Sequence, residues 1–127
     1  LLECVVDGAK TLETAKKVAK SVICSSLLKA AMFGEDANWG RVLCAIGYSG
    51  AEVDVTKIDV TFTSKAGSVA VCKNGYGIDF SEEVASTVLH EKEINIMISL
   101  NDGSETATAW GCDLTYDYVK INGDYRT

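Results

Sequence analysis

The sequence predicts a single α+β domain in two layers, with a mixed or antiparallel sheet covered by helices. Its length of 127 residues suits one domain. Segments with apolar residues at every third or fourth position are typical of helices, and they lie among segments of alternating apolar and polar residues, which are typical of strands. Taken in order, these segments predict the element sequence β-α-α-α-β-β-α-β-β-α within residues 1–127.

The first strand and the first helix follow from the start of the chain. Residues 2–7 alternate and predict a strand that Gly8 closes. Thr11 is suited to cap a helix, and Glu13 lies in the first turn, where the positive end of the helix dipole favours an acid. The predicted apolar stripe of this helix consists of Ala15, Val18, Ala19, Val22 and Ile23.

Two shorter helices are predicted next. Ser25 or Ser26 caps the second helix, which ends at Phe33 with Gly34 as a left-handed stop. The third helix runs from about 39 to 46 and is followed by glycine and serine residues that end it. Three helices therefore separate the first strand from the second.

The segment 33–41, with the sequence FGEDANWGR, joins these two helices. Asp36 or Asn38 caps the third helix. Gly40 is unusual inside a helix, because it costs about 1 kcal/mol relative to Ala. We therefore expect either a close approach of another group to the backbone, or a tight turn between helices with Trp39 packed over it.

The second half of the chain alternates strands and helices. Residues 58–63 and 69–73 predict a hairpin, and Asp79 with Glu82 predicts a capped helix that runs to about His90. The later elements are a strand over residues 94–100, a turn, its hairpin partner over 105–113 and a last helix over 115–121.

Composition excludes several classes of protein. Apolar residues make up 47% of the chain, which argues against disorder, and no apolar run approaches the length of a membrane helix. The net charge is −6, from 12 basic and 18 acidic residues, so the chain lacks the basic character expected of a nucleic-acid binder. We therefore expect neither nucleic acid nor membrane among its partners.

Cysteine chemistry points to free thiols. No CxxC pair is present, so a zinc site is not expected. Each thiol lies in an apolar stretch, which predicts burial and a reducing compartment such as the cytoplasm. The five cysteines are Cys4, Cys24, Cys44, Cys72 and Cys112. His90 is the one imidazole, and its pairing with Cys112 or Cys72 would make a hydrolase dyad, although an exposed histidine at a helix end explains it more simply.

The C-terminal segment 109–127 is richer in aromatic residues than chain ends usually are. It holds Trp110 and three tyrosines around the last predicted helix. Two interpretations are open. The segment either packs on its own domain, or it carries Asn122, Arg126 and the carboxylate of Thr127 to a neighbouring site.

Two long motifs, FGEDANWGR at 33–41 and AWGCDLTYDYVKINGDYRT at 109–127, resemble the ornithine acetyltransferase family. IGYSG at 46–50 and SLLK at 26–29 fit the same pattern. This family comprises the bifunctional glutamate N-acetyltransferases of arginine biosynthesis. The resemblance implies that residues 1–127 form the C-terminal domain of the β chain of a longer, self-cleaving precursor.

The same resemblance implies the activity and the partners. Such an enzyme transfers an acetyl group from N2-acetylornithine to glutamate, and some members also use acetyl-CoA as donor. The nucleophile is the N-terminal Thr of the β chain, which lies upstream of this sequence, and no cofactor is needed. The expected partners are the α chain and the remainder of the β chain, in a cytoplasmic assembly of two α and two β chains.

For this chain the resemblance implies substrate-binding residues and no catalytic one. By position in the motif, Asn122 and Thr127 match the substrate-binding Asn and the C-terminal Thr of the family. Gly123 departs from the pattern, since many relatives carry Ala there. The fragment alone is expected to be inactive. The alternative function is a non-catalytic interaction module that only holds the α/β assembly together.

Overall fold

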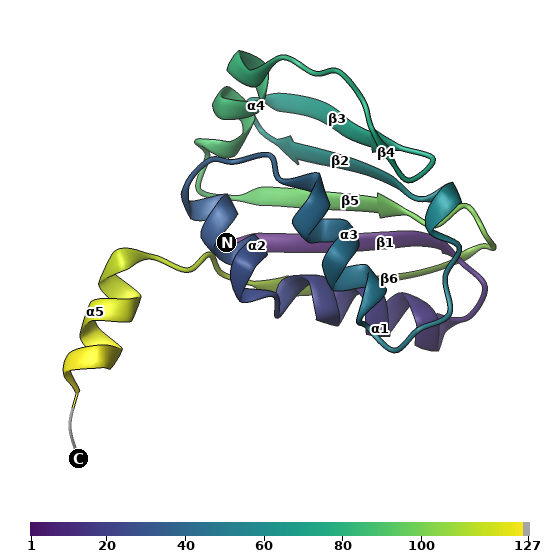
Figure 1. The fold of residues 1–127 in the computed structure, drawn as a ribbon, viewed down its shortest axis with the longest axis horizontal. Helices are drawn as coiled ribbons and strands as arrows, with labels where there is room; N and C mark the ends of the chain where they lie inside the picture. The colour runs from purple at the N-terminus through teal and green to yellow at the C-terminus, as the bar shows by residue number, and fades with distance from the viewer. Residues whose placement is uncertain (126–127) are drawn as a thin grey trace.

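The computed structural model describes residues 1–125 and confirms the α+β class, with one six-stranded sheet and five α-helices (Figure 1). The helices are α1 (Leu12–Ile23), α2 (Ser26–Phe33), α3 (Trp39–Gly47), α4 (Glu82–Leu89) and α5 (Tyr116–Asp124). The strands are β1 (Leu2–Ala9), β2 (Asp59–Ser64), β3 (Gly67–Lys73), β4 (Tyr76–Gly77), β5 (Ile94–Ser99) and β6 (Glu105–Gly111). The short strand β4 and a 3-10 turn at Val55–Lys57 were not predicted.

The sheet is mixed, with the strand order β4-β3-β2-β5-β1-β6. β1 pairs in parallel with β5 and antiparallel with β6. The prediction that residues 94–100 and 105–113 form a hairpin was therefore wrong. The turn between them crosses the end of β1, where the amide of Asp102 donates to the carbonyl of Gly8 at 2.7 Å, so β1 lies between the two strands.

The core lies between the sheet and the helices on one of its faces. The five residues of the predicted α1 stripe are all buried, and the side chain of Thr11 caps this helix as expected. On the sheet, the predicted inward residues Ile58, Val60 and Phe62 are fully buried. Buried residues of α4 belong to the same cluster. One continuous core therefore joins α1 to α4 over the same sheet face.

The opposite face of the sheet carries no helix of the described chain (Figure 1). Its central row is formed by Val5, Met97 and Thr61, which are neighbours in register and only half-buried. Trp110 lies on the same face and is 62% exposed. Its indole Nε1 donates to Glu3 Oε2 at 2.9 Å. We call this surface the open face.

Several predicted boundaries were wrong for local reasons. β1 continues past Gly8, which takes φ = 69° within an irregularity of the β1–β6 pairing. Gly34 does not adopt a left-handed conformation, and Glu35 does so instead, with φ = 56°. The cap of α4 is Ser81, whose hydroxyl accepts from the amide of Val84, so the predicted Asp79–Glu82 capping box was also wrong.

The cysteines divide into two groups. Cys4 and Cys72 are buried as predicted, and burial raises the pKa of Cys4 to about 12. Cys24, Cys44 and Cys112 are exposed, so the prediction of burial was wrong for them. Cys24 and Cys44 follow apolar residues in sequence, yet Cys24 comes directly after α1 and Cys44 lies on the outer side of α3. Cys112 comes directly after β6, between Gly111 and Asp113. No helix among residues 1–125 is long and apolar enough to cross a membrane.

Candidate functional site

The last described helix forms an arm that projects from the body of the domain (Figure 1). We call residues 112–125 the C-terminal arm. It is attached at its beginning, where the amide of Leu114 donates to the carbonyl of Lys29 at 3.2 Å. The ring of Tyr116 meets Phe33 edge-on, with centroids 5.3 Å apart. Both anchors lie on α2, whose last residue, Phe33, is also the first residue of the FGEDANWGR motif.

Beyond this attachment the arm is exposed. No residue of α5 is buried. Of the two interpretations of the C-terminal segment, close packing on its own domain is therefore limited to the start of the arm. The large side chains that it presents to solvent are Tyr116, Tyr118, Val119, Ile121 and Tyr125. Tyr118 and Ile121 are three positions apart, which places them on one side of α5. Tyr125 follows the last residue of this helix.

Asn122 lies on the exposed arm, next to Ile121 and one helical turn after Tyr118. Its amide Nδ2 donates to the carbonyl of Tyr118 at 2.9 Å, one turn back along the same helix. This bond fixes the orientation of the side-chain amide relative to α5. Arg126 and Thr127 lie outside the described residues. The structure therefore presents Asn122 at the surface, while its grouping with Thr127 stays a prediction.

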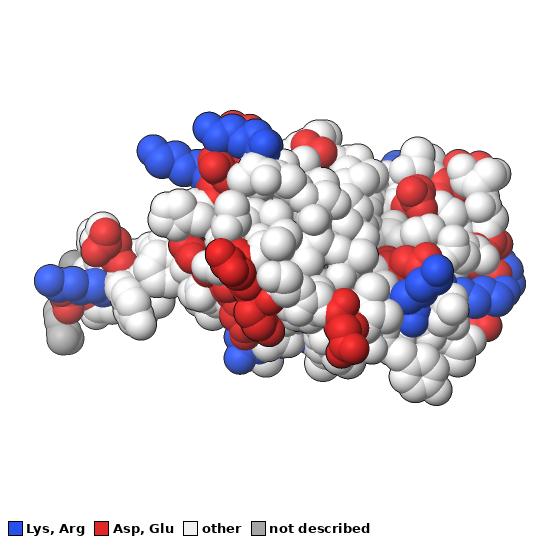
Figure 2. Space-filling view, turned by 90° about the horizontal axis from the view of Figure 1, so that it is seen from above, with Lys and Arg blue, Asp and Glu red and all other residues white. Residues whose placement is uncertain are grey.

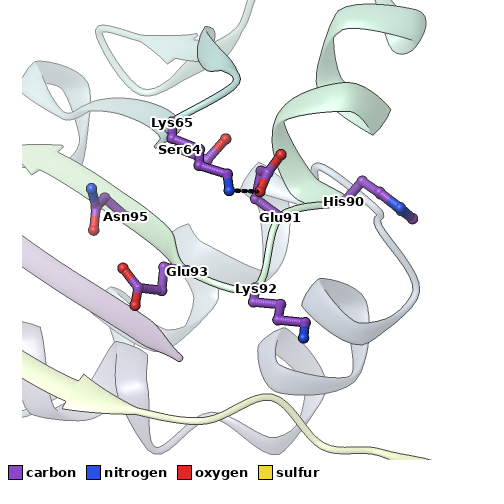
Figure 3. A pocket seen from close by; sticks show the side chains of 7 residues that line it. All are labelled: Ser64, Lys65, His90, Glu91, Lys92, Glu93 and Asn95. Atoms are coloured by element: carbon purple, nitrogen blue, oxygen red, sulfur yellow. Dashed lines mark ion pairs between the residues drawn. The ribbon is translucent and has the colours of Figure 1, made fainter.

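A second candidate is a hollow of about 640 Å³ beside the turn that follows α4. Figure 3 shows the side chains that line it, with an ion pair of 3.5 Å between Lys65 and Glu91. The lining residues are Ser64, Lys65, His90, Glu91, Lys92, Glu93 and Asn95. Charges of both signs alternate around this hollow, so it does not present a single charge to a ligand.

His90 ends α4, as predicted, and contacts the loop after α2. Its Nδ1 lies 2.6 Å from Glu35 Oε1, and the hydroxyl of Ser86 donates to the other carboxylate oxygen at 3.3 Å. The hydrogen bond to Glu35, and then the charge of that carboxylate, raise the pKa of His90 above its ordinary value. This pair connects α4 to the 33–41 segment across 55 positions of sequence.

The described residues do not show the contact between a thiol and His90 that a Cys–His dyad needs. The ring of His90 contacts Glu35, not a thiol. The Cys72 thiol is buried and donates to the carbonyl of Ile58 at 3.7 Å, and burial raises its pKa. A raised pKa disfavours the thiolate that nucleophilic catalysis needs. Among the described residues, no group of three or more potential ligands is arranged to hold a metal ion.

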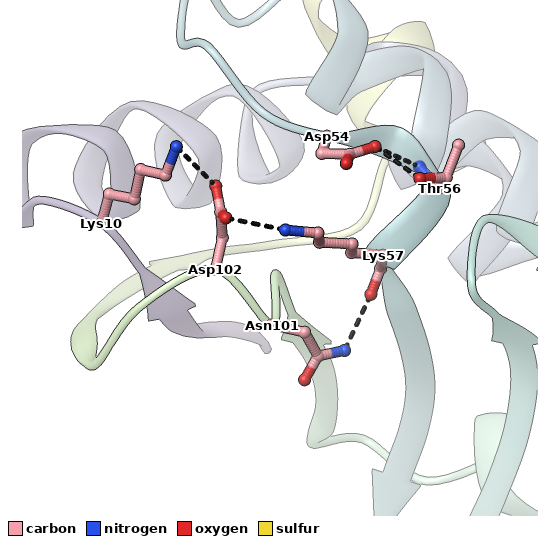
Figure 4. A network of polar contacts seen from close by, with 6 residues as sticks. All are labelled: Lys10, Asp54, Thr56, Lys57, Asn101 and Asp102. Carbon is pink, nitrogen blue, oxygen red and sulfur yellow. Dashed lines mark hydrogen bonds and ion pairs between the residues drawn. The ribbon is translucent and has the colours of Figure 1, made fainter.

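A polar network closes the other end of the sheet (Figure 4). Asp102 forms ion pairs with Lys57 at 3.1 Å and Lys10 at 3.5 Å. Asn101 donates to the carbonyl of Lys57 at 2.7 Å. Near it, the side-chain hydrogen bond from Thr56 lowers the pKa of Asp54. These contacts tie the β5–β6 turn to the start of α1 and to β2, which indicates a structural role.

The structure does not show the close approach to the backbone that Gly40 suggested, and nothing in it explains a glycine at this position. A side chain at Gly40 would meet only Asn38 Oδ1, at 3.4 Å. The close approach instead involves the neighbouring Trp39, whose indole occupies the space that a Cβ at Gly77 would need. Trp39 therefore fixes α3 against β4 in a contact that the local sequence does not reveal.

Uncharged surface is another feature that sequence reasoning missed. Figure 2, which views the molecule from above, shows a broad uncharged area in the middle of this side, bordered by acidic groups below it and by charges of both signs toward the two ends. β3, β4 and α4 lie on this side in Figure 1. The exposed apolar side chains on or beside these elements include Tyr76, Ile78 and Val84. Together with the open face, this area is available for contact with further polypeptide.

An α+β domain with one bare sheet face that is apolar at its centre and a projecting arm is typical of a domain that packs against further polypeptide. The whole chain, residues 1–127, matches the ArgJ family model. The chain belongs to the ArgJ family.

Curated relatives carry the same description. The chain is 54% identical over all of its 127 residues to arginine biosynthesis bifunctional protein ArgJ 1 of Clostridium acetobutylicum, of which it covers 31%. It is also 54% identical to the ArgJ protein of Caldanaerobacter subterraneus subsp. tengcongensis, of which it covers 32%. The chain thus spans about a third of the length of these relatives.

The fold agrees with a solved structure of the same family. The crystal structure of the arginine biosynthesis bifunctional protein ArgJ from Bacillus halodurans superposes with a TM-score of 0.87 at 44% sequence identity. The match covers 98% of this chain and 57% of that one. The sequence resemblance to a bifunctional enzyme of arginine biosynthesis is therefore confirmed at the level of family and fold.

Proposed function

We propose that this chain is the C-terminal domain of the β chain of a self-cleaving enzyme that transfers an acetyl group from N2-acetylornithine to glutamate. The single observation that supports this most strongly is the match of the entire chain to the ArgJ family. In this proposal the nucleophile is the N-terminal Thr of the β chain, upstream of this sequence. An N-terminal amine can serve as base for its own hydroxyl, so the transfer needs no cofactor. Acetyl-CoA is a possible second donor, and the cytoplasm is the proposed location.

The role of this domain is to supply part of the substrate site through the arm. The exposed side-chain amide of Asn122, held by its bond to Tyr118, is suited to hydrogen bonding with the polar groups of an amino-acid substrate. We assign the terminal Thr127 the complementary role, because a carboxylate attracts the ammonium group of such a substrate. The arm reaches away from its own sheet, which fits a site completed by polypeptide outside this chain.

The partner of the open face is proposed to be the remainder of the same precursor. The half-buried Val5 and Met97 and the exposed Trp110 give this face an apolar centre that a second layer of polypeptide would cover. The proposed assembly contains two α and two β chains. A specific alternative is that the domain only holds this assembly together, and the exposed aromatic residues of the arm favour it, since tyrosine is enriched at interfaces.

One experiment separates the two functions. In the complete α/β enzyme, we compare Asn122→Ala and deletion of Thr127 with Lys120→Ala, a control on the same exposed helix. If the arm binds substrate, the first two variants raise KM for N2-acetylornithine or glutamate severalfold, while the control and the assembly mass stay unchanged. Unchanged kinetics in both variants would refute the binding role. Dissociation of the α and β chains, with substrate affinity intact, would establish the alternative.

A further inference from the structure

Two exposed thiols far apart in sequence line one hollow in the helical layer. Cys24 follows the last residue of α1, and Cys44 lies on α3. Both are free and exposed. The hollow measures about 530 Å³ and is lined by Cys24, Ser25, Ser26, Leu27, Asn38, Gly40, Arg41, Cys44 and Tyr48. Neither thiol has a role in the proposed acetyl transfer, so their placement needs a separate explanation.

Two hydrogen bonds fix how the segments carrying these thiols lie against each other. The hydroxyl of Ser21 donates to the carbonyl of Ala45 at 2.7 Å. Six residues later, the carbonyl of Leu27 accepts from Arg41 Nη1 at 2.8 Å. As the first segment advances from 21 to 27, its partner therefore runs back from 45 to 41. Cys24 lies between the two contacts on the first segment and Cys44 lies between them on the second, so both thiols belong to the stretch where these segments are held together.

We propose that Cys24 and Cys44 are a redox-active thiol pair, which a hydroperoxide converts to an intramolecular disulfide. In the first step the thiolate of one cysteine attacks a peroxide oxygen; the O–O bond breaks and a sulfenic acid forms. The thiolate of the other cysteine then attacks the sulfenic sulfur, and water leaves as the S–S bond forms. Overall, two thiols and one hydrogen peroxide give one disulfide and two molecules of water.

The other cysteines provide internal comparisons. Cys4 and Cys72 are buried, and burial raises the pKa of both thiols, which makes them poor nucleophiles in the folded chain. Cys112 is exposed but does not line the hollow. Simple exposure therefore predicts equal oxidation of three thiols, whereas the proposal predicts that two of them become linked to each other.

The disulfide would join the end of α1 to the middle of α3. Since α2 lies between them in sequence, the bond closes a loop that contains all of α2 and the 33–41 segment. A cross-link that closes such a loop restricts the unfolded chain. Oxidation is thus expected to raise the Tm, and a thiol reductant should reverse the shift.

The test treats the folded 127-residue chain with hydrogen peroxide at pH 8, blocks remaining thiols under denaturing conditions, and digests it with trypsin without reduction. Cleavage at Lys20, Lys29, Arg41 and Lys57 releases the cysteines in separate peptides, 21–29 and 42–57. The expected product is these two peptides joined, with the mass of two hydrogen atoms lost. Joining must disappear in Cys24→Ser and in Cys44→Ser and persist in Cys112→Ser.

Other products would overturn the proposal. Recovery of both peptides with each thiol still alkylated would show that no bond forms. A link between Cys24 and Cys112, or between two copies of the chain, would show that the hollow does not select its pair. If peroxide raised the Tm of Cys24→Ser and of Cys44→Ser as much as that of the parent chain, the rise would come from another modification.

Discussion

The contact between Trp39 and Gly77 yields a prediction whose size can be worked from the structure. A Cβ added at Gly77 would overlap Cζ2 of the indole and lie 2.6 Å from its Cε2. The indole must therefore move for Gly77→Ala to fold, and overpacking of this kind costs about 1–3 kcal/mol. Gly77 does not have positive φ, so the alanine also gains about 0.4–1 kcal/mol through the unfolded chain. The net loss of stability is expected to be about 1–2 kcal/mol, the middle of the range that these two effects allow.

Urea unfolding followed by circular dichroism measures this loss, since a change in midpoint at constant slope reports stability. Gly47→Ala is the matched control, because no heavy atom lies within 4 Å of a Cβ at Gly47 in the described structure. That variant should be neutral or slightly stabilising. The decisive comparison repeats Gly77→Ala in a Trp39→Ala background, where the clash is absent and the substitution should cost little. An equal cost in both backgrounds would refute the reasoning.

Three further predictions concern single side chains. Phe62→Ala removes a fully buried ring and should destabilise the domain by about 3–5 kcal/mol in the same urea assay, whereas a loss below about 1 kcal/mol would contradict its central place in the core. Glu35→Gln should lower the pKa of His90 toward its ordinary value of 6.5, as an NMR titration would measure. Because the pKa of His90 is raised in the folded chain, the Glu35–His90 pair stabilises the fold fully below pH 6.5, and this stabilisation is lost as the pH rises through the raised pKa. Cys4 should resist a thiol reagent at pH 8 until the chain unfolds, and reaction as fast as that of Cys112 would show that it is not buried.

Local patterns predicted the elements that bury one clear face. The α1 stripe, with five apolar residues at helical spacing, gave its helix, cap and buried residues correctly. The alternation of Ile94, Ile96 and Ile98 gave β5 and its buried side. In both cases the burial period is a property of consecutive residues, so the chain itself carries the information.

Such patterns could not predict which strands lie side by side in the sheet. β6 follows β5 after a short turn, which favours a hairpin, yet β1 is inserted between them. An alternating strand defines which side is buried but not which strand lies beside it. The contact between Trp110 and Glu3, separated by 107 positions, depends on this insertion. The same limit applies to Glu35 and His90, which no local signal connects.

The capping of α4 illustrates a different limit. Asp79 and Ser81 are both residues that cap helices well, and Glu82 at the right spacing favoured Asp79. The structure uses Ser81, which moves Glu82 and Glu83 into the first turn, where the helix dipole stabilises both acids. Choosing Asp79 would have placed the helix start two residues earlier. Where two capping residues lie a few positions apart, the hydrogen bonds and charges of the whole first turn decide which of them caps the helix.

The open face and the arm show why part of the candidate site could not be predicted from this chain alone. In β2 the outward residue Thr61 suits water, as on the solvated face of an antiparallel sheet. In the central strands, however, the outward positions are Val5 and Met97, and the edge carries Trp110. A face that is polar at one side and apolar at its centre is better explained by partial cover than by solvent alone. An arm that buries none of its own helix residues fits the same explanation, because apart from the contact of Tyr116 with Phe33 its exposed tyrosines gain little burial on this domain.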